Sequence, residues 1–213
     1  RLVSVTDPAG GQTSYAYDAV GNLTELTDPL GNPWTFAYDA QDRLIRETDP
    51  LGYAETYTYD AAGNLVAQTD RNGRVTTFAY DALDRLVEEQ WWDADELVNA
   101  LTYTYDAAGN LLSAGDASSQ YAFAYDALGR VVSVDNAGTP GMPRVVLSYA
   151  HDTAGNLVSV TDSLGVEVAS TYDTRNLLAS RSWQGGGIDP ARVDFAYTAL
   201  GQPVELRRFA DAT

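Results

Sequence analysis

Acidic residues placed near glycine and asparagine recur along this chain, and the first chemistry they suggest is calcium binding. Examples are DPLG at Asp28, DAAGN at Asp60 and DRNG at Asp70. An EF-hand needs alternating Asp residues before Gly and a distal Glu, and a calcium-binding β-roll needs a nine-residue repeat. Neither spacing occurs in the sequence. We therefore interpret these Asp residues as turn formers, and we expect no metal ion and no other cofactor.

Catalytic chemistry has little support in the sequence. The one histidine, His151, occupies a position that is Tyr in the other copies of a repeat, so we interpret it as a tolerated side chain in a strand. Paired carboxylates carry no information in so acidic a chain. No glycine-rich phosphate loop lies between a strand and a helix. We expect a chain that is not an enzyme.

A binding site is the remaining possibility, and the adjacent Trp91 and Trp92 are its candidates. Aromatic rings have an apolar face and a polar rim, which suits sugar rings. The pair falls in residues 88–100, which interrupt the repeat spacing and are expected to form an extended loop. An exposed pair would indicate recognition of a partner. A pair that packs over the end of a sheet would be structural instead.

Most of the chain consists of one repeated phrase. YDAAGNL occurs at Tyr59 and again at Tyr105. Copies of its first aromatic are spaced by 20 to 26 residues, most often 21, and an internal repeat of this length decides the architecture. The aromatic position is occupied by Tyr17, Tyr38, Tyr59, Tyr80, Tyr105, Tyr125, His151, Tyr172 and Tyr197. Asp follows it in all units but the last, as Asp18, Asp39, Asp60, Asp81, Asp106, Asp126, Asp152 and Asp173.

Each repeat predicts a β-hairpin. Two residues before the Tyr lies a second aromatic in most units, with Ala or Thr between them, and this period of two is typical of a strand with two unlike faces. Four residues after the Tyr only Gly, Asp or Asn occur, the residues that tolerate positive φ. An Asp, two ordinary residues and a left-handed residue describe a type I turn closed by a bulge. Positive φ is thus predicted at Gly21, Asp42, Gly63, Asp84, Gly109, Gly129, Gly155, Asn176 and Gly201.

The second strand of each unit ends in another turn of the same kind, such as DPLG at Asp49. We predict an all-β fold: an antiparallel β-hairpin repeat meander of about twenty short strands. A twisted sheet this wide should curl, and we expect a curved or spiralling sheet that forms part of a hollow shell. Residues 1–213 are expected to be a single repeat domain cut from a longer array, because the first unit is partial. Extended loops are expected at residues 88–100, 136–144 and 182–192.

Composition limits the partners. The 213 residues include 30 Asp and Glu against 13 Arg and Lys, a formal charge of −17, and no Cys. This charge repels nucleic acid and anionic membranes, so we expect neither as a partner. An acidic, solvated surface explains the charge, although it would also attract a basic partner. Without Cys there is no disulfide framework.

The repeat resembles the RHS/YD-repeat family, which is named after its Tyr-Asp dipeptide. The stretches GNPWTFAYDAQDRL and GRVTTFAYDALDRL match the motif G-x-x-x-x-Y-x-Y-D-x-x-G-N/R-L closely. The similarity extends over nearly the whole chain. The departures are His151 in place of Tyr, Asn176 in place of Gly, and the loss of Asp after Tyr197.

This resemblance implies a function. Such repeats build a sheet that spirals into a hollow shell; in Tc toxins and bacterial polymorphic toxins the shell holds a C-terminal toxin domain, and teneurins carry a related shell at the cell surface. We expect a structural shell segment of a secreted or surface-exposed protein. Its partners would be further repeats and an enclosed toxin domain of the same polypeptide. The alternative is a surface adhesin that binds glycans or a protein. DPLG at Asp28 and Asp49 is similar to part of the family's self-cleavage signature, but it recurs at turn spacing and is interpreted as a turn.

Overall fold

The computed structural model describes residues 1–136 and 140–211, and every regular element in these residues is a β-strand. Residues 137–139, which belong to the expected loop 136–144, lie outside the described residues. The chain divides into two compact units, unit 1 (Arg1–Thr102) and unit 2 (Tyr103–Thr213), with the boundary inside the tenth strand. Each unit is described by itself.

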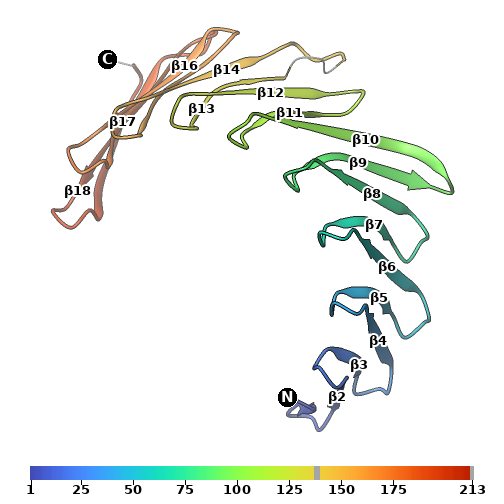
Figure 1. Ribbon diagram of the computed structural model, residues 1–213. Coiled ribbons are helices and arrows are strands. Elements are labelled where there is room, and N and C mark those ends of the chain that lie inside the picture. Colours follow the sequence, from blue (N-terminus) through green and yellow to red (C-terminus); the bar gives the residue numbers. More distant parts are fainter. Residues whose placement is uncertain (137–139, 212–213) are drawn as a thin grey trace. The chain divides into compact units, whose positions relative to one another are not determined.

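Unit 1 is an antiparallel meander in which each strand pairs with the next one along the chain. Figure 1 shows its strands following one another in chain order, with the turns at alternate ends. The strands are β1 (Ser4–Thr6), β2 (Gln12–Tyr17), β3 (Leu23–Thr27), β4 (Pro33–Tyr38), β5 (Leu44–Thr48), β6 (Ala54–Tyr59), β7 (Leu65–Thr69), β8 (Val75–Tyr80), β9 (Leu86–Asp93) and β10 (Glu96–Tyr105).

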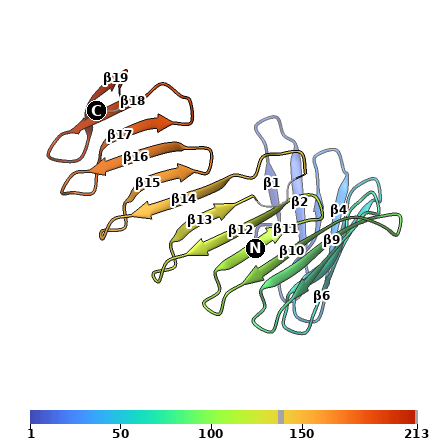
Figure 2. The ribbon, with the colours of Figure 1, turned by 90° about the horizontal axis from the view of Figure 1, so that it is seen from above.

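Unit 2 repeats this arrangement. Its successive strands also pair antiparallel and lie in chain order, as Figure 2 shows. They are β11 (Leu111–Gly115), β12 (Gln120–Tyr125), β13 (Val131–Asp135), β14 (Val146–His151), β15 (Leu157–Asp162), β16 (Val166–Tyr172), β17 (Leu178–Gly185), β18 (Ala191–Tyr197) and β19 (Pro203–Phe209).

The two faces of the sheet differ as the alternation in sequence predicts. In β4, Trp34, Phe36 and Tyr38 are half-buried on one face, which we call the aromatic face, whereas Ala37 between them is exposed on the other. No large apolar side chain in the described residues is fully buried. Each unit is therefore a single layer, and its apolar contacts lie on the aromatic face rather than in an enclosed core.

The predicted fold class is confirmed: the described chain is an all-β antiparallel meander of 19 strands, against about twenty predicted. The expected loop at 88–100 is wrong. Its extra residues lengthen β9 and β10, which are joined by a two-residue turn with positive φ at Ala94 (46°) and Asp95 (68°). Such a turn matches the twist of the flanking strands, so the ladder continues to its end.

The expected loop at 182–192 is also shorter than predicted, because β17 extends to Gly185 and β18 begins at Ala191. Positive φ at Gly185, Gly186 and Gly187 confines the reversal to a few residues. The interpretation of residues 1–213 as one repeat domain stays a prediction.

Candidate functional site

The Tyr-Asp phrase forms one tight hairpin turn in each repeat. At Asp60, the backbone N–H donates to the carbonyl of Asn64 at 2.9 Å, and the N–H of Gly63 donates back to the carbonyl of Asp60 at 3.2 Å. The strand register slips by one residue between Thr58 and Tyr59. A type I turn followed by a left-handed residue has this geometry, so the predicted turn is confirmed.

The Asp carboxylate holds the turn together from inside. Oδ1 of Asp60 accepts the N–H groups of Gly63 and Asn64, each at 2.8 Å, and Oδ2 accepts the side-chain amide of Asn64 at 3.1 Å. The backbone hydrogen bond from Asn64 is the main reason that the pKa of Asp60 is lowered. The carboxylate therefore stays ionised at neutral pH and serves as a turn clamp rather than a proton donor or acceptor.

Positive φ is confirmed at every predicted position. Gly residues supply most of them without steric cost, whereas Asp42 (61°), Asp84 (58°) and Asn176 (62°) hold the left-handed conformation with a side chain. The glycines of this set are Gly21 (115°), Gly63 (101°), Gly109 (92°), Gly129 (74°), Gly155 (92°) and Gly201 (80°).

The three non-glycine residues have a reason to be there, which the sequence reasoning missed. In unit 1, the amide of Asn22 donates to Asp42 Oδ1 at 2.8 Å, one turn further along the same edge, and Asn64 donates to Asp84 Oδ1 at 2.9 Å. In unit 2, Asn156 donates to Asn176 Oδ1 at 3.0 Å. An acceptor at the left-handed position thus links consecutive turns.

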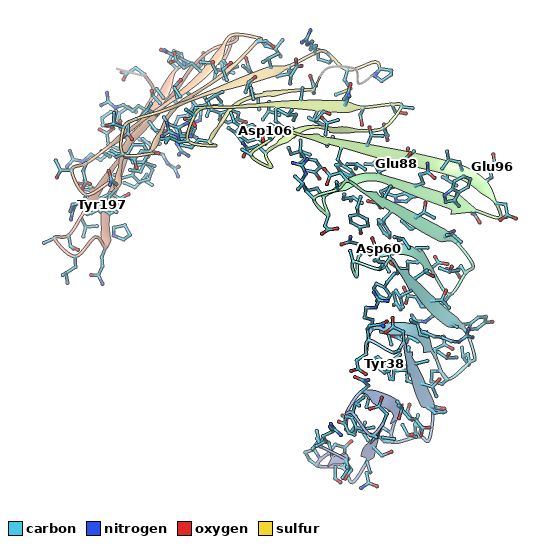
Figure 3. The ribbon with its side chains drawn as sticks, in the orientation of Figure 1. Tyr38, Asp60, Glu88, Glu96, Asp106 and Tyr197 are labelled. Atoms are coloured by element: carbon cyan, nitrogen blue, oxygen red, sulfur yellow. The ribbon has the colours of Figure 1, made fainter. Side chains whose placement is uncertain are left out.

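Arginine makes the same link in other repeats. Arg43 clamps its own turn through Asp39 Oδ2 at 2.7 Å and donates to the carbonyl of Asp60 at 3.1 Å. Its guanidinium also lies over the ring of Tyr59, 4.6 Å from the ring centre. In unit 2, Arg130 reaches the carbonyl of Asp152 at 3.2 Å. Figure 3 labels Asp60 at this turn edge of unit 1, and Glu96 at the opposite ends of the strands.

These linked turns explain an alternation in the sequence. Where Asn stands after the left-handed residue, the next turn carries Asp or Asn in three of four cases, and where Arg stands there, the next turn carries Gly-Asn. The exception is Asn110, which is followed by Gly129. The pairing of G-N with D-R units was the signal that could have predicted the links.

The tyrosine of the phrase ties neighbouring hairpins together. The hydroxyl of Tyr59 donates to the carbonyl of Leu44, at the start of the preceding strand, at 2.9 Å. The same bond, at 2.8–3.0 Å, is made by Tyr17 to Leu2, Tyr38 to Leu23, Tyr80 to Leu65, Tyr125 to Leu111 and Tyr172 to Leu157. Phe never occupies this position, although Phe and Tyr mix two residues earlier, and that difference was a readable sign of the hydroxyl's role.

His151 is the exception in this column. It replaces a Tyr at the end of β14, and its Nδ1 atom is buried with no hydrogen-bond partner in the described part of the chain. An imidazole is too short to make the bond that the Tyr hydroxyl makes.

Trp91 and Trp92 lie in β9 rather than in a loop, and adjacent strand residues point to opposite faces. Trp91 shares the aromatic face with Phe78 and is 42% exposed, and its indole N–H donates to Glu89 Oε1 at 2.6 Å. Trp92 is half-buried on the other face, where its N–H reaches Thr77 Oγ1 at 3.4 Å. The two rings therefore do not form one aromatic platform.

Trp91 borders a cavity of about 410 Å³ in unit 1, which we call the Trp91 cavity. Across the sheet, Thr76 lies opposite Gln68 on one side and Trp91 on the other. The cavity is lined further by Asp70, Arg74, Val75, Trp92, Asp93 and Val98. Its lining combines two tryptophans, two carboxylates and one guanidinium.

A second charged group lies nearby on the same face. Glu47 and Glu55 stand directly opposite each other on β5 and β6, an arrangement that is destabilising for like charges. The Arg71 guanidinium pairs with both and lies 5.0 Å from the ring centre of Trp34. Arg71 thus offsets the repulsion between Glu47 and Glu55, and we interpret these three side chains as a structural group.

The described residues contain no group of three or more His, Cys, Asp or Glu side chains placed to hold a metal ion. They also include no helix that is long and apolar enough to cross a membrane.

Comparison with known proteins gives three results. A family model described as RHS Repeat matches residues 1–33, 17–56, 38–67, 59–90 and 105–140, more than half of the chain. No curated protein matches. Among solved structures, the crystal structure of TcdB2-TccC3-TEV matches with a TM-score of 0.75 and 18% identity, over 99% of this chain and 12% of that one.

Two further structures are similar. A Tc holotoxin pore of Photorhabdus luminescens has a TM-score of 0.59 and 18% identity, over 90% of this chain and 13% of that one. TcdB2-TccC3 without its hypervariable C-terminal region has a TM-score of 0.59 and 17% identity, over 89% and 14%. At these identities the similarity shows the fold, and the chain spans only 12–14% of the length of the structures it matches.

Proposed function

The chain belongs to the RHS-repeat family, and from this premise we propose that it is a non-enzymatic wall segment of a shell that encloses a C-terminal toxin or effector domain of its parent protein. Its partners are then further repeats and the enclosed domain of the same polypeptide. The parent would act outside the cell, secreted or at the surface. The match over 99% of the chain to a Tc toxin structure supports this assignment.

One observation carries the proposal. Every strongly repeated side chain holds a turn, links one hairpin to the next or fills the aromatic face, and none is left over for chemistry. The bonds from Tyr59 to Leu44 and from Asn64 to Asp84 run from one hairpin to its neighbour, so they strengthen the sheet in the direction in which repeats are added. A wall needs this property, whereas an active site would be expected once, as a departure from the repeat.

Limited proteolysis of the full-length parent protein tests enclosure. The segment after the repeats should resist protease in the intact parent and be cut rapidly when it is produced alone. Opening the wall with a double Gly63→Val and Gly109→Val variant should expose it. Equal cutting of the segment in all three samples would reject the proposal, as would a parent with no domain after its repeats.

The rival role is adhesion to glycans or to a surface protein. Of the two tryptophans expected to bind together, Trp91 alone remains a candidate, because the two rings lie on opposite faces and Trp91 is the exposed one on the aromatic face. A glycan array with the 213-residue chain tests it directly. Specific binding that is lost in Trp91→Ala and kept in Trp92→Phe would replace the wall by an adhesin.

A further inference from the structure

We propose that the Trp91 cavity binds a cationic side chain, arginine or lysine, of a polypeptide segment. The cavity lies wholly within unit 1 and does not depend on whether the parent chain encloses a domain. Its volume of about 410 Å³ is in the range of small ligand sites. A long cationic side chain has two parts, an apolar stem and a charged head, and the cavity offers a matching surface for each.

The stem is matched by Trp91 and Val98. Both residues border the cavity and remain accessible: Trp91 is 42% exposed and Val98 is 64% exposed. The register of β9 with β10 slips between Leu97 and Asn99, which leaves Val98 at the irregularity. The hydrogen bond from the Trp91 indole to Glu89 restrains the ring, so its face is available without a large loss of side-chain freedom on binding.

The head is matched by Asp70 and Asp93. Asp70 Oδ1 is used inside its turn, where it accepts the N–H groups of Asn72 and Arg74 at 2.8 and 2.9 Å. The backbone bond from Arg74 is the first cause of its lowered pKa, so the carboxylate is charged at neutral pH. A guanidinium or ammonium placed over an indole and beside a carboxylate gains both cation–π and ionic attraction.

Arg74 is a cation of the chain itself that lines the cavity and pairs with Asp93. Its Nε lies 3.7 Å from Asp93 Oδ2, and both side chains are largely exposed, 63% and 59%. A single long contact at this exposure is weak, so an incoming cation can replace it. Unit 1 as a whole carries 18 Asp and Glu against 6 Arg, a net charge of −12, which favours the approach of a cation over that of an anion.

A peptide titration of the 213-residue chain tests this site. The probe is the blocked peptide acetyl-GSRSRSG-amide, and its matched control is acetyl-GSQSQSG-amide. Binding is followed by the indole N–H signals of the four tryptophans in a two-dimensional ¹H–¹⁵N NMR spectrum, assigned by single Trp→Phe substitutions. The arginine peptide should shift the Trp91 signal and the glutamine peptide should not. The shift should weaken between 50 and 500 mM salt.

The variants have signed expectations. Trp91→Ala and Asp70→Asn should each lower affinity by about 2–5-fold, whereas Arg74→Gln should raise it by a similar factor, because it removes the competing cation. Asp28→Asn changes a turn of the same kind away from the cavity and is the matched control for Asp70→Asn. Trp183→Ala, in unit 2 and outside the lining of the cavity, is the control for Trp91→Ala. Circular dichroism and thermal melting check that each variant is folded, and Trp91→Phe substitutes for the alanine variant if that one is not.

Three results would overturn the proposal. The first is equal binding of the glutamine peptide, and the second is weaker binding by Arg74→Gln in a folded protein. The third is a shift of the Trp91 signal by a neutral glycan, maltohexaose, without one by the arginine peptide; this would assign the cavity to sugars. A Trp91 shift by the arginine peptide alone, strengthened by Arg74→Gln, would establish the cationic site.

Discussion

Units 1 and 2 have the same kind of turn but differ in the side chains on their aromatic faces. In unit 1 the residue opposite the upstream aromatic is polar in three hairpins: Leu26, Glu47, Gln68 and Glu89 occupy the position. In unit 2 it is mainly apolar: Val134, Val160 and Leu206 lie opposite aromatic residues, and Arg181 lies opposite Ser170, which takes the place of the aromatic there. Net charge follows the same division, −12 against −5.

The turns, rather than the facing side chains, are the part of the repeat that both units share. The Asp clamp and the left-handed residue are kept in both units although the facing side chains change from carboxylates to aliphatic groups. The turns fix the register, and register decides which residues meet across the strands. The face is then free to vary, and in unit 1 it carries the Glu47, Glu55 and Arg71 group and the Trp91 cavity.

Acid should have the largest effect and should destabilise unit 1 more than unit 2. Turn hydrogen bonds lower the carboxyl pKa at more positions in unit 1 (Asp18, Asp28, Asp39, Asp60, Asp70 and Asp81) than in unit 2 (Asp106, Asp126, Asp152 and Asp173). A lowered folded pKa means that the unfolded chain binds protons first. The stabilisation is fully present above the unfolded pKa, about 4, and is lost as pH falls through the folded values.

Hydrogen exchange between pH 5 and pH 2, corrected for the intrinsic rate, would measure this loss. Amides of the Asp60 and Asp81 turns in unit 1 should lose protection together with those of the Asp126 and Asp152 turns in unit 2. The total loss should be larger in unit 1, because more of its turns carry the shift. Protection that is unchanged down to pH 2 would contradict the role of the carboxylates as clamps.

A side chain at the left-handed glycine should cost the same in either unit. Gly63→Val and Gly155→Val each force a β-branched residue to positive φ, and each should destabilise the chain by about 1–2 kcal/mol. No atom lies within 4 Å of a Cβ built at Gly155, so the cost there is backbone strain alone. Urea unfolding measures it. Gly→Asn at the same sites should cost clearly less, and equal costs for Val and Asn would refute the strain argument.

Substitutions at the Tyr position of the repeat should change stability in opposite directions in the two units. Tyr59→Phe removes the hydroxyl bond to Leu44 and should cost about 1 kcal/mol. His151→Tyr in unit 2 removes an unpaired buried nitrogen and supplies a hydroxyl at the end of the ring, so it should raise stability by a similar amount. Thermal unfolding of both variants distinguishes the two directions. A destabilised His151→Tyr would mean that β14 is not equivalent to the other Tyr strands.

The links between turns should give the smallest effect. Asp84→Gly in unit 1 and Asn176→Gly in unit 2 each remove an acceptor for the preceding Asn and at the same time relieve a left-handed side chain. The two terms oppose each other, so the net change should stay within about 0.5 kcal/mol. Chemical denaturation of the pair measures it. A loss above 1 kcal/mol in either unit would show that the exposed links contribute more than such contacts usually do.

Sequence alone predicts the repeated strands, the turns between them and the left-handed residue of each turn. These are local properties: Asp60 clamps residues three and four positions away, and only Gly, Asp or Asn occurs at the left-handed position of the repeat. Two sequence patterns that we did not interpret also indicate contacts between hairpins. The absence of Phe from the Tyr59 position indicates the hydroxyl bonds, and the alternation of G-N with D-R units indicates the links between turns.

The site at Trp91 depends on contacts between strands that sequence patterns do not reveal. The sequence places Trp91 beside Trp92, and a loop would have let both rings face one partner. A two-residue turn at Ala94 and Asp95 instead continued the strands, and strand alternation separated the rings onto opposite faces. The cavity joins residues from four strands, β7 to β10, among them Gln68, Thr76 and Trp91, and their meeting depends on register across the sheet, which no single repeat contains.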